Sequence, residues 1–314
     1  CWGVSIVRTI FMGNPNFAIP ALEAVHRSEH DLIAVVSSPP KPMGRGRSLQ
    51  STPVGNFARS NGIDLIEPIS LRSDRLIDQL KELKPDLFVI VAYKILPNAL
   101  INIPTYGAIN LHASLLPKYR GAGPIQWALM NGDKDTGVTI FQIKQKVDTG
   151  NILLQKKLKI HEDDNMLTLG MRLCEAGADM IIQTINNIES GKTNPIEQDS
   201  AMATKAPKIT KDMTIIDWSW PAVKIHNWVR GLSPHPGMST TLFQKRFRIF
   251  KTEKIDRNSD EPGAIIELSK EKLIVGTGQG SLSLLEVQTE GKKQMPIEEF
   301  IKGTRLAIGD KLGI

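Results

Sequence analysis

Asn110 and His112 are the best candidates for side chains that act together on one reacting group, because they stand two positions apart within the stretch 107–121. Aliphatic residues alternate with them, and in an extended strand this spacing places the amide and the imidazole on one face. A side-chain amide can stabilise a developing oxyanion, and an imidazole can move a proton. The pair therefore suits chemistry at a carbonyl carbon.

Asp148 is the candidate for a carboxylate that orients this imidazole. It lies in the sequence Val-Asp-Thr-Gly, after an alternating, strand-like run at 137–144. A carboxylate beside a catalytic histidine holds the ring and stabilises its cationic form. An aspartate followed by Thr149 and Gly150 can equally brace a turn, so the residues alone leave both roles open.

The remaining ionisable residues indicate no second site. Cys1 and Cys174 are too few and too far apart in sequence for a disulfide framework or a thiolate metal site. No group of histidine, cysteine and carboxylate residues has the spacing of metal ligands, so we expect no metal. The other histidines have no evident partner residues and are interpreted as surface or core positions: His26, His30, His161, His226 and His235.

Asn110 and His112 need a strand of a sheet to position them, and the sequence of the N-terminal half predicts such a sheet. Apolar runs without alternation predict strands, and helical apolar spacing predicts helices between them: 8–12, 32–37 and 86–92 for the strands, 17–27 and 73–83 for the helices. This order is typical of an α/β fold with a parallel sheet covered on both faces, where ligands bind at the carboxyl ends of the strands. The turn at Gly13 lacks Gly-x-Gly-x-x-Gly, so a dinucleotide is not implied.

The second half predicts a different architecture. A long amphipathic helix at 164–190 precedes the polar segment 193–212, which we interpret as a linker. Beyond it, one short helix and several short strands predict a small barrel. We therefore expect a Rossmann-like catalytic domain over 1–192, the linker, and a C-terminal OB-like β-barrel domain over 213–314.

Composition and charge limit the class of protein. The chain is 41% hydrophobic and 23% charged, as in globular proteins, with no apolar run of membrane-spanning length and no secretory signal pattern at its start. A cytoplasmic location is the simplest expectation. Residues 205–314 carry a net charge of +5, against +1 for residues 1–204, which favours a polyanionic partner for the C-terminal part.

Two basic segments could contact phosphates. The first is the Pro/Gly-rich loop 38–47, which includes Arg45 and follows a predicted strand. The second is a cationic run in the C-terminal domain that includes Lys245, Arg246 and Arg248. Ordinary solvated surface is the alternative for each of these side chains.

The chain resembles the methionyl-tRNA formyltransferase family over nearly its whole length. The combination of Asn-x-His-x-Ser-Leu-Leu-Pro at 110–117 with Asp-Thr-Gly at 148–150 is specific for formyltetrahydrofolate-dependent enzymes. The Gly-Arg-Gly-Arg loop, the Lys-Ile-Thr-Lys-Asp junction and the basic C-terminal domain separate formylation of tRNA from formylation of purine precursors or sugar nucleotides. The matching stretches are Ile10–Leu22, Ser38–Val54, Pro85–Ala92, Gly107–Gly123, Asp133–Gly150 and Lys208–Trp218.

The resemblance implies transfer of the formyl group of 10-formyltetrahydrofolate to the α-amino group of initiator methionyl-tRNA, for translation initiation, by a monomeric enzyme without a metal. It implies that Asn110, His112 and Asp148 are catalytic. It also implies that Arg45 approaches the tRNA acceptor end. The residues expected to line the folate site are Ser114, Leu115, Leu116 and Pro117.

Two departures from the family pattern stand near the expected site. The segment 91–97 lacks the glycine of the usual Val-Ala-Tyr-Gly-x-Ile-Leu-Pro, and Pro40 stands where an aspartate is common. Two other functions stay open at this stage. One is formylation of a small amine such as a sugar nucleotide, and the other is nucleic-acid binding by a protein whose formyltransferase-like half is inert.

Overall fold

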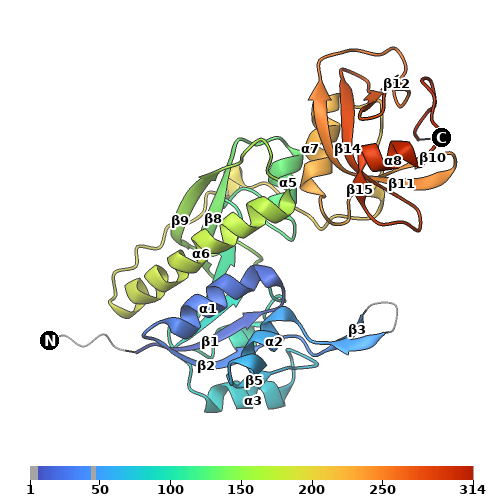
Figure 1. Cartoon of the computed structure of the whole chain (residues 1–314). Coiled ribbons are helices and arrows are strands. Elements are labelled where there is room, and N and C mark those ends of the chain that lie inside the picture. Colours follow the sequence, from blue (N-terminus) through green and yellow to red (C-terminus); the bar gives the residue numbers. More distant parts are fainter. Residues whose placement is uncertain (1–5, 44–46, 314) are drawn as a thin grey trace. The chain divides into compact units, whose positions relative to one another are not determined.

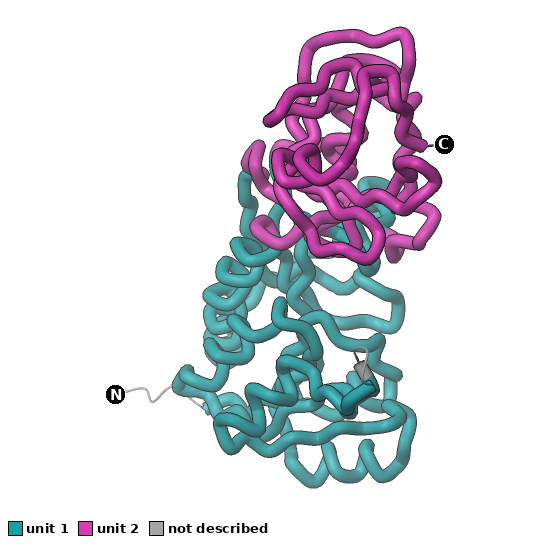
Figure 2. The backbone as a smooth tube through the Cα atoms, turned by 45° about the vertical axis from the view of Figure 1, so that its right-hand side comes forward, with its two compact units in different colours: residues 1–124, 135–159, 170–206 teal, residues 125–134, 160–169, 207–314 magenta. Residues whose placement is uncertain are grey.

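The computed structural model describes residues 6–43 and 47–313. They form two compact units, coloured separately in Figure 2. Unit 1 comprises the described residues of 1–124 together with 135–159 and 170–206. Unit 2 comprises 125–134, 160–169 and the described residues from Pro207 onward. The units thus divide after Ala206, inside the segment 193–212.

A seven-stranded sheet forms the centre of unit 1 (Figure 1). Its order is β5-β2-β1-β6-β7-β8-β9, with parallel pairing among the first five strands and antiparallel pairing of β8 with β7 and of β9 with β8. The mostly parallel, Rossmann-like sheet is therefore confirmed. The strands are β1 (Arg8–Gly13), β2 (Asp31–Val36), β5 (Leu65–Ile66), β6 (Leu87–Val91), β7 (Ala108–His112), β8 (Asp135–Gln142) and β9 (Ile152–Lys159).

Helices cover this sheet, and two of them show on which face Asn110 and His112 lie. Leu80 of α3 packs with Ile90 and Ala108 on one face. Gly177 of α6 approaches the opposite face so closely that a Cβ there would lie 2.5 Å from Leu111. Since side chains alternate along β7, Asn110 and His112 share the face of Ala108. The helices are α1 (Ile19–Arg27), α2 (Pro53–Ser60), α3 (Asp74–Glu82), α4 (Asn98–Ile101) and α6 (Met166–Glu189), with 3-10 turns η1 (Asn16–Ala18) and η2 (Ser200–Met202).

The loop after β2 contains a short hairpin that the sequence patterns did not predict. It pairs β3 (Lys41–Met43) with β4 (Ser48–Gln50) in antiparallel register. Arg45, the residue expected to approach tRNA, lies outside the described residues.

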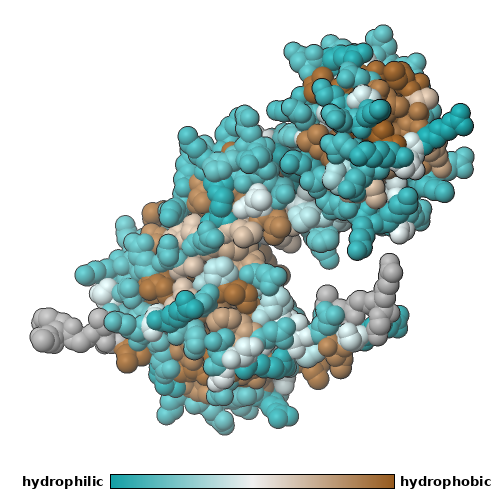
Figure 3. Space-filling model, viewed as in Figure 1, coloured by the Kyte–Doolittle hydropathy of each residue, from teal (hydrophilic) through white to brown (hydrophobic). Residues whose placement is uncertain are grey.

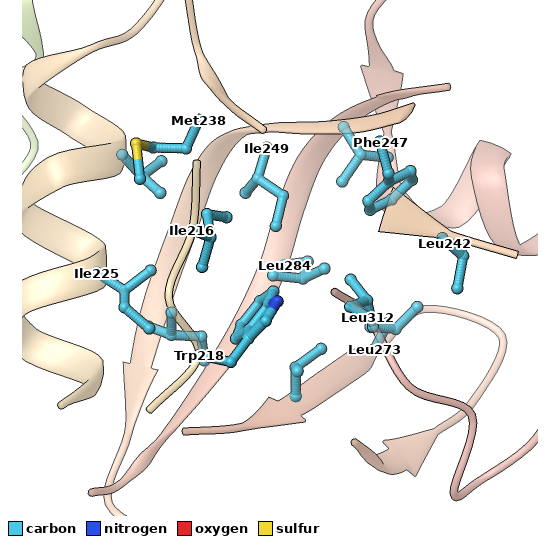
Figure 4. Close-up of a cluster of buried hydrophobic side chains, with 14 of the residues drawn as sticks. Ile216, Trp218, Ile225, Met238, Leu242, Phe247, Ile249, Leu273, Leu284 and Leu312 are labelled. Atoms are coloured by element: carbon cyan, nitrogen blue, oxygen red, sulfur yellow. The ribbon is translucent and has the colours of Figure 1, made fainter. Parts of the chain in front are cut away.

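Unit 2 is built on an antiparallel sheet of order β10-β11-β14-β13-β12, with β15 beside β14. Trp218 lies in its core (Figure 4), and its indole N–H donates to the Thr240 hydroxyl at 3.1 Å. This bond satisfies the one polar atom of a buried tryptophan. The elements are α5 (Pro124–Met130), η3 (Asp212–Thr214), α7 (Ala222–Gly231), β10 (Met238–Leu242), β11 (Lys245–Ile255), β12 (Ile265–Leu268), β13 (Leu273–Gly276), β14 (Ser281–Thr289), β15 (Met295–Pro296) and α8 (Ile297–Lys302).

A closed OB-like barrel is not confirmed. The strand order leaves β10 and β12 at the two ends of the sheet. Residues 309–313 bond to both ends, through the bridges of Leu312 with Leu242 and of Lys311 with Ala264 and through neighbouring backbone hydrogen bonds, but they form no strand of the sheet. The coarser architecture, a C-terminal domain built on an antiparallel sheet, is what the structure shows.

Hydrophilic side chains cover most of the face shown in Figure 3. Among the described residues, no helix combines the length and the apolar character that a bilayer crossing needs. The same part of the chain holds no cluster of three or more histidine, cysteine or carboxylate residues that could ligate a metal ion.

Candidate active site

Asn110 and His112 lie at the carboxyl end of β7, where the parallel part of the sheet meets its antiparallel part. Asn110 pairs with Ile90 of β6 on one side and with Phe141 of β8 on the other, and His112 pairs with Thr139. His112 is only 6% exposed, whereas Asn110 is half-buried. The alternation expected from the sequence thus places the amide and the imidazole side by side on one face.

The imidazole of His112 has two polar neighbours. Its Nε2 lies 2.8 Å from the carbonyl oxygen of Tyr119, and its Nδ1 lies 3.9 Å from Oδ2 of Asp148. A carbonyl oxygen only accepts hydrogen bonds, so Nε2 carries the hydrogen and Nδ1 of the neutral ring carries the lone pair. At 3.9 Å the Asp148 carboxylate makes no hydrogen bond to the ring.

Asp148 is held in place by its own backbone and by the loop opposite. Its φ angle is +54°, in the left-handed region, and its Oδ2 accepts a hydrogen bond from the Gly121 N–H at 2.8 Å. Two residues later, a Cβ on Gly150 would lie 1.5 Å from the carbonyl oxygen of Gln142. Glycine is therefore required where the chain enters β9, which accounts for the last residue of the Asp-Thr-Gly sequence.

The structure brings Asn110, His112 and Asp148 to one place in unit 1. The Asn110 amide makes no hydrogen bond to another residue of the described ranges, so it is available to a ligand. Tyr93, two residues beyond β6, adds a second free polar group: its hydroxyl is buried and has no partner within the described part of the chain. Burial raises the pKa of Tyr93 to about 12, so the hydroxyl remains a neutral donor.

The expected folate residues fall into two groups. Ser114 and Leu116 are fully buried and bond to Thr139, whose hydroxyl donates to the Ser114 carbonyl at 2.6 Å and accepts from the Leu116 N–H at 3.1 Å. These two buried residues therefore fix the conformation of the loop that follows β7. Leu115 and Pro117 are half-buried and leave side-chain surface for a ligand.

The expected phosphate-binding residues of β11 do not all share one face. Arg246 and Arg248 are two positions apart and lie on the outer face of the sheet, opposite Thr241 and Ser239 of β10. Lys245 points to the other side, at the exposed start of the strand. The Nε atom of Arg248 is buried without a hydrogen-bond partner in the described chain, which leaves one donor of a cation unused.

Sequence reasoning missed three positions that bond to His112 or Asp148: Tyr119, Gly121 and Gln198, whose Nε2 donates to the Asp148 carbonyl. Gly121 has a φ of +125°, and a Cβ there would lie 2.5 Å from the Ala206 carbonyl oxygen. The glycines in Arg-Gly-Ala-Gly were a usable signal for such a tight backbone. Tyr119 contributes its backbone carbonyl, which any residue could provide. Gln198 is one of many polar residues in its segment, so its residue type did not distinguish it.

Comparisons with known proteins identify both halves of the chain. Residues 7–185 match the formyl transferase family, and residues 208–305 match the formyl transferase C-terminal domain. The methionyl-tRNA formyltransferase of Thermodesulfovibrio yellowstonii is 46% identical over 301 residues, which are 96% of this chain and 97% of that protein. The enzyme of the same name from Caldanaerobacter subterraneus is 41% identical over 305 residues, 96% of this chain and 99% of its own.

Solved structures with lower identity share the fold. HypX from Aquifex aeolicus in complex with tetrahydrofolic acid is 17% identical, with a TM-score of 0.67 over 97% of this chain and 51% of that one. WlaRD, a sugar 3N-formyl transferase, is 19% identical, with a TM-score of 0.66 over 92% of this chain and all of that one. At these identities the likeness concerns architecture alone.

Proposed function

The chain belongs to the formyl transferase family, and we propose that it transfers the formyl group of 10-formyltetrahydrofolate to the α-amino group of initiator methionyl-tRNA. The product would be N-formylmethionyl-tRNA, for translation initiation. The observation that carries the proposal is the similarity to methionyl-tRNA formyltransferases across both domains, at 38–46% identity. The convergence of Asn110, His112 and Asp148 in unit 1 supports the same reaction.

The residues at the carboxyl ends of β6 and β7 fit a folate donor. Such a donor carries several hydrogen-bonding groups, and the buried Tyr93 hydroxyl has no partner in the described protein. Leu115 and Pro117 add half-buried apolar surface, and the Asn110 amide, which has no hydrogen bond to the described residues, can bind an oxygen atom. When bound, the donor supplies an activated formyl carbon.

Each member of the trio has a distinct role in this mechanism. The Asn110 amide donates to the formyl oxygen as negative charge develops on it. The Nδ1 atom of His112 takes up the proton that the attacking amine loses and returns it to the leaving nitrogen. Asp148, 3.9 Å away, stabilises the imidazolium that exists between these two transfers.

The substrate class is tested by offering three acceptors to the purified protein with 10-formyltetrahydrofolate. We expect formylation of methionyl-tRNA and none of uncharged tRNA or of an amino-sugar nucleotide. The label is carried by the formyl group of the donor, and transfer is measured as acid-stable label on each acceptor. Formylation of the amino-sugar nucleotide in preference to methionyl-tRNA would support the small-amine alternative, and binding of tRNA without any transfer would support an inert binding protein.

Arg246 and Arg248 are proposed to contact tRNA phosphates, together with Lys245 and with Arg45. The shared face of the two arginines and the exposed position of Arg246 support this role. Because phosphate contacts release counterions, the KM for methionyl-tRNA should rise about tenfold between 50 and 200 mM salt. The KM for the folate donor should change little.

The double variant Arg246→Ala/Arg248→Ala should raise the KM for tRNA at low salt and flatten its salt dependence, with kcat nearly unchanged. Arg27→Ala is the matched control, because Arg27 is an exposed cation of α1 that already pairs with Glu23. A double variant with the salt response of the wild-type protein would refute the phosphate contact.

A further inference from the structure

Gln198 uses its whole hydrogen-bonding capacity inside unit 1. Its Nε2 donates to the carbonyl oxygens of Asp148, at 3.0 Å, and Gly150, at 2.7 Å. Its Oε1 accepts from Nε and Nη2 of Arg120, at 3.1 and 2.8 Å. The side chain has two N–H donors and two acceptor lone pairs, so all four are satisfied in a residue only 7% exposed.

The two segments that Gln198 joins each carry a polar neighbour of His112. The turn at Asp148 brings the carboxylate to 3.9 Å from Nδ1. The segment at Arg120 follows Tyr119, whose carbonyl accepts from Nε2 at 2.8 Å. A further bond, from the Gly121 N–H to Asp148 Oδ2, closes the connection between the two segments.

The chain beyond Gln198 holds the same loop from its other side. The Thr204 hydroxyl accepts from the Tyr119 N–H at 2.8 Å, and the Thr204 carbonyl accepts from the Arg120 N–H at 2.9 Å. The Ala206 N–H then donates to the Arg120 carbonyl at 2.7 Å. The orientation of the imidazole therefore depends on residues 198–206, a segment remote in sequence from 110–150.

On the basis of the formyl transfer proposed above, we propose that Gln198 is a positioning residue for His112. It fixes the Tyr119 carbonyl and the Asp148 carboxylate at their separate nitrogens, and so keeps the ring as the Nε2–H tautomer with Nδ1 ready to take the proton. Gln198 acts only through these two groups. Displacement of a catalytic group by about 1 Å can cost about a hundredfold in rate.

The variant Gln198→Met tests this role, because methionine has a similar length and removes all four hydrogen bonds. We expect kcat to fall about 10- to 100-fold, with KM for both substrates within about twofold of wild type. ¹⁵N NMR of histidine, with His112 assigned from a His112→Gln sample, should show one Nε2–H tautomer in the wild type and a mixture in the variant. Thr184→Val is the control, since it removes one buried hydrogen bond, to the Met180 carbonyl of α6, away from His112.

A Gln198→Met protein with kcat within twofold of wild type would overturn the role of Gln198. So would an equal loss of kcat in Thr184→Val. If Gln198→Met does not fold, Gln198→Asn takes its place, because it keeps the amide but shortens the side chain by one methylene. A folded Gln198→Asn protein with unchanged kcat also refutes the proposal. Failure of the wild-type protein to formylate methionyl-tRNA refutes the proposed function instead, so the two outcomes are distinct.

Discussion

Replacing His112 with alanine should lower kcat for formyl transfer by about 10²–10⁴-fold, the range typical of losing a general acid–base group. The His112 imidazole lies on the same face of β7 as Asn110, and the Asp148 carboxylate, 3.9 Å from Nδ1, makes no hydrogen bond to the ring that could pass a proton directly. The KM values should change much less, because the proton transfer belongs to the transition state. Steady-state kinetics with methionyl-tRNA and the folate donor measure both parameters.

Two companion variants separate chemistry from packing. Removal of the His112 ring deletes the hydrogen bond to the Tyr119 carbonyl, which costs about 0.5–1.5 kcal/mol of stability. His112→Gln retains an N–H donor but cannot take up a proton, and should be as inactive as His112→Ala. His26→Ala, at an exposed histidine of α1, should keep kcat within twofold. Activity near wild type in His112→Gln would show that another group moves the proton.

The relation between Asn110 and His112 could be predicted from sequence because it is local. Strand alternation alone places residues i and i+2 on one face, whatever the rest of the fold does. The buried strands β1, β2 and β6 were predictable for the same reason, since unbroken apolar runs are typical of strands covered on both faces.

The environment of His112 could not be predicted in the same way. Asp148 was suggested by its motif, but its distance from Nδ1 depends on the left-handed backbone at 148 and on the hydrogen bond from Gly121. The partner at Nε2 is a backbone carbonyl, which every residue possesses. Gln198 lies in a segment that polarity predicts to be a linker, yet its side chain is buried. Such polar contacts over long sequence distances leave no periodic pattern.

Local sequence patterns also could not predict whether the C-terminal sheet closes into a barrel. Several short strands were predicted for this part of the chain, and the structure has such strands there, including β13 (Leu273–Gly276). Whether a sheet closes depends on pairing between its first and last strands. Here β10 and β12 do not pair, and residues 309–313 bond to the two ends instead, which no periodic sequence pattern could indicate.

Replacing Asn110 with alanine should lower kcat by about 10²–10³-fold, as expected when one donor to a developing oxyanion is removed. The amide has no hydrogen bond to the described protein, so its loss leaves no partner unsatisfied and should change the free energy of unfolding by less than about 1 kcal/mol. A large kinetic loss with little loss of stability distinguishes a catalytic donor from a structural one. Kinetics and urea unfolding of the same samples provide the comparison.

Asn110→Asp sharpens this test, because aspartate has nearly the same shape but presents an ionised oxygen where the amide presents N–H. A carboxylate repels a developing oxyanion, so Asn110→Asp should be at least as inactive as Asn110→Ala although it restores the volume. If side-chain volume were what mattered, Asn110→Asp would recover activity over Asn110→Ala. Recovery of that kind would remove the oxyanion role from Asn110 and leave His112 as the sole catalytic group of β7.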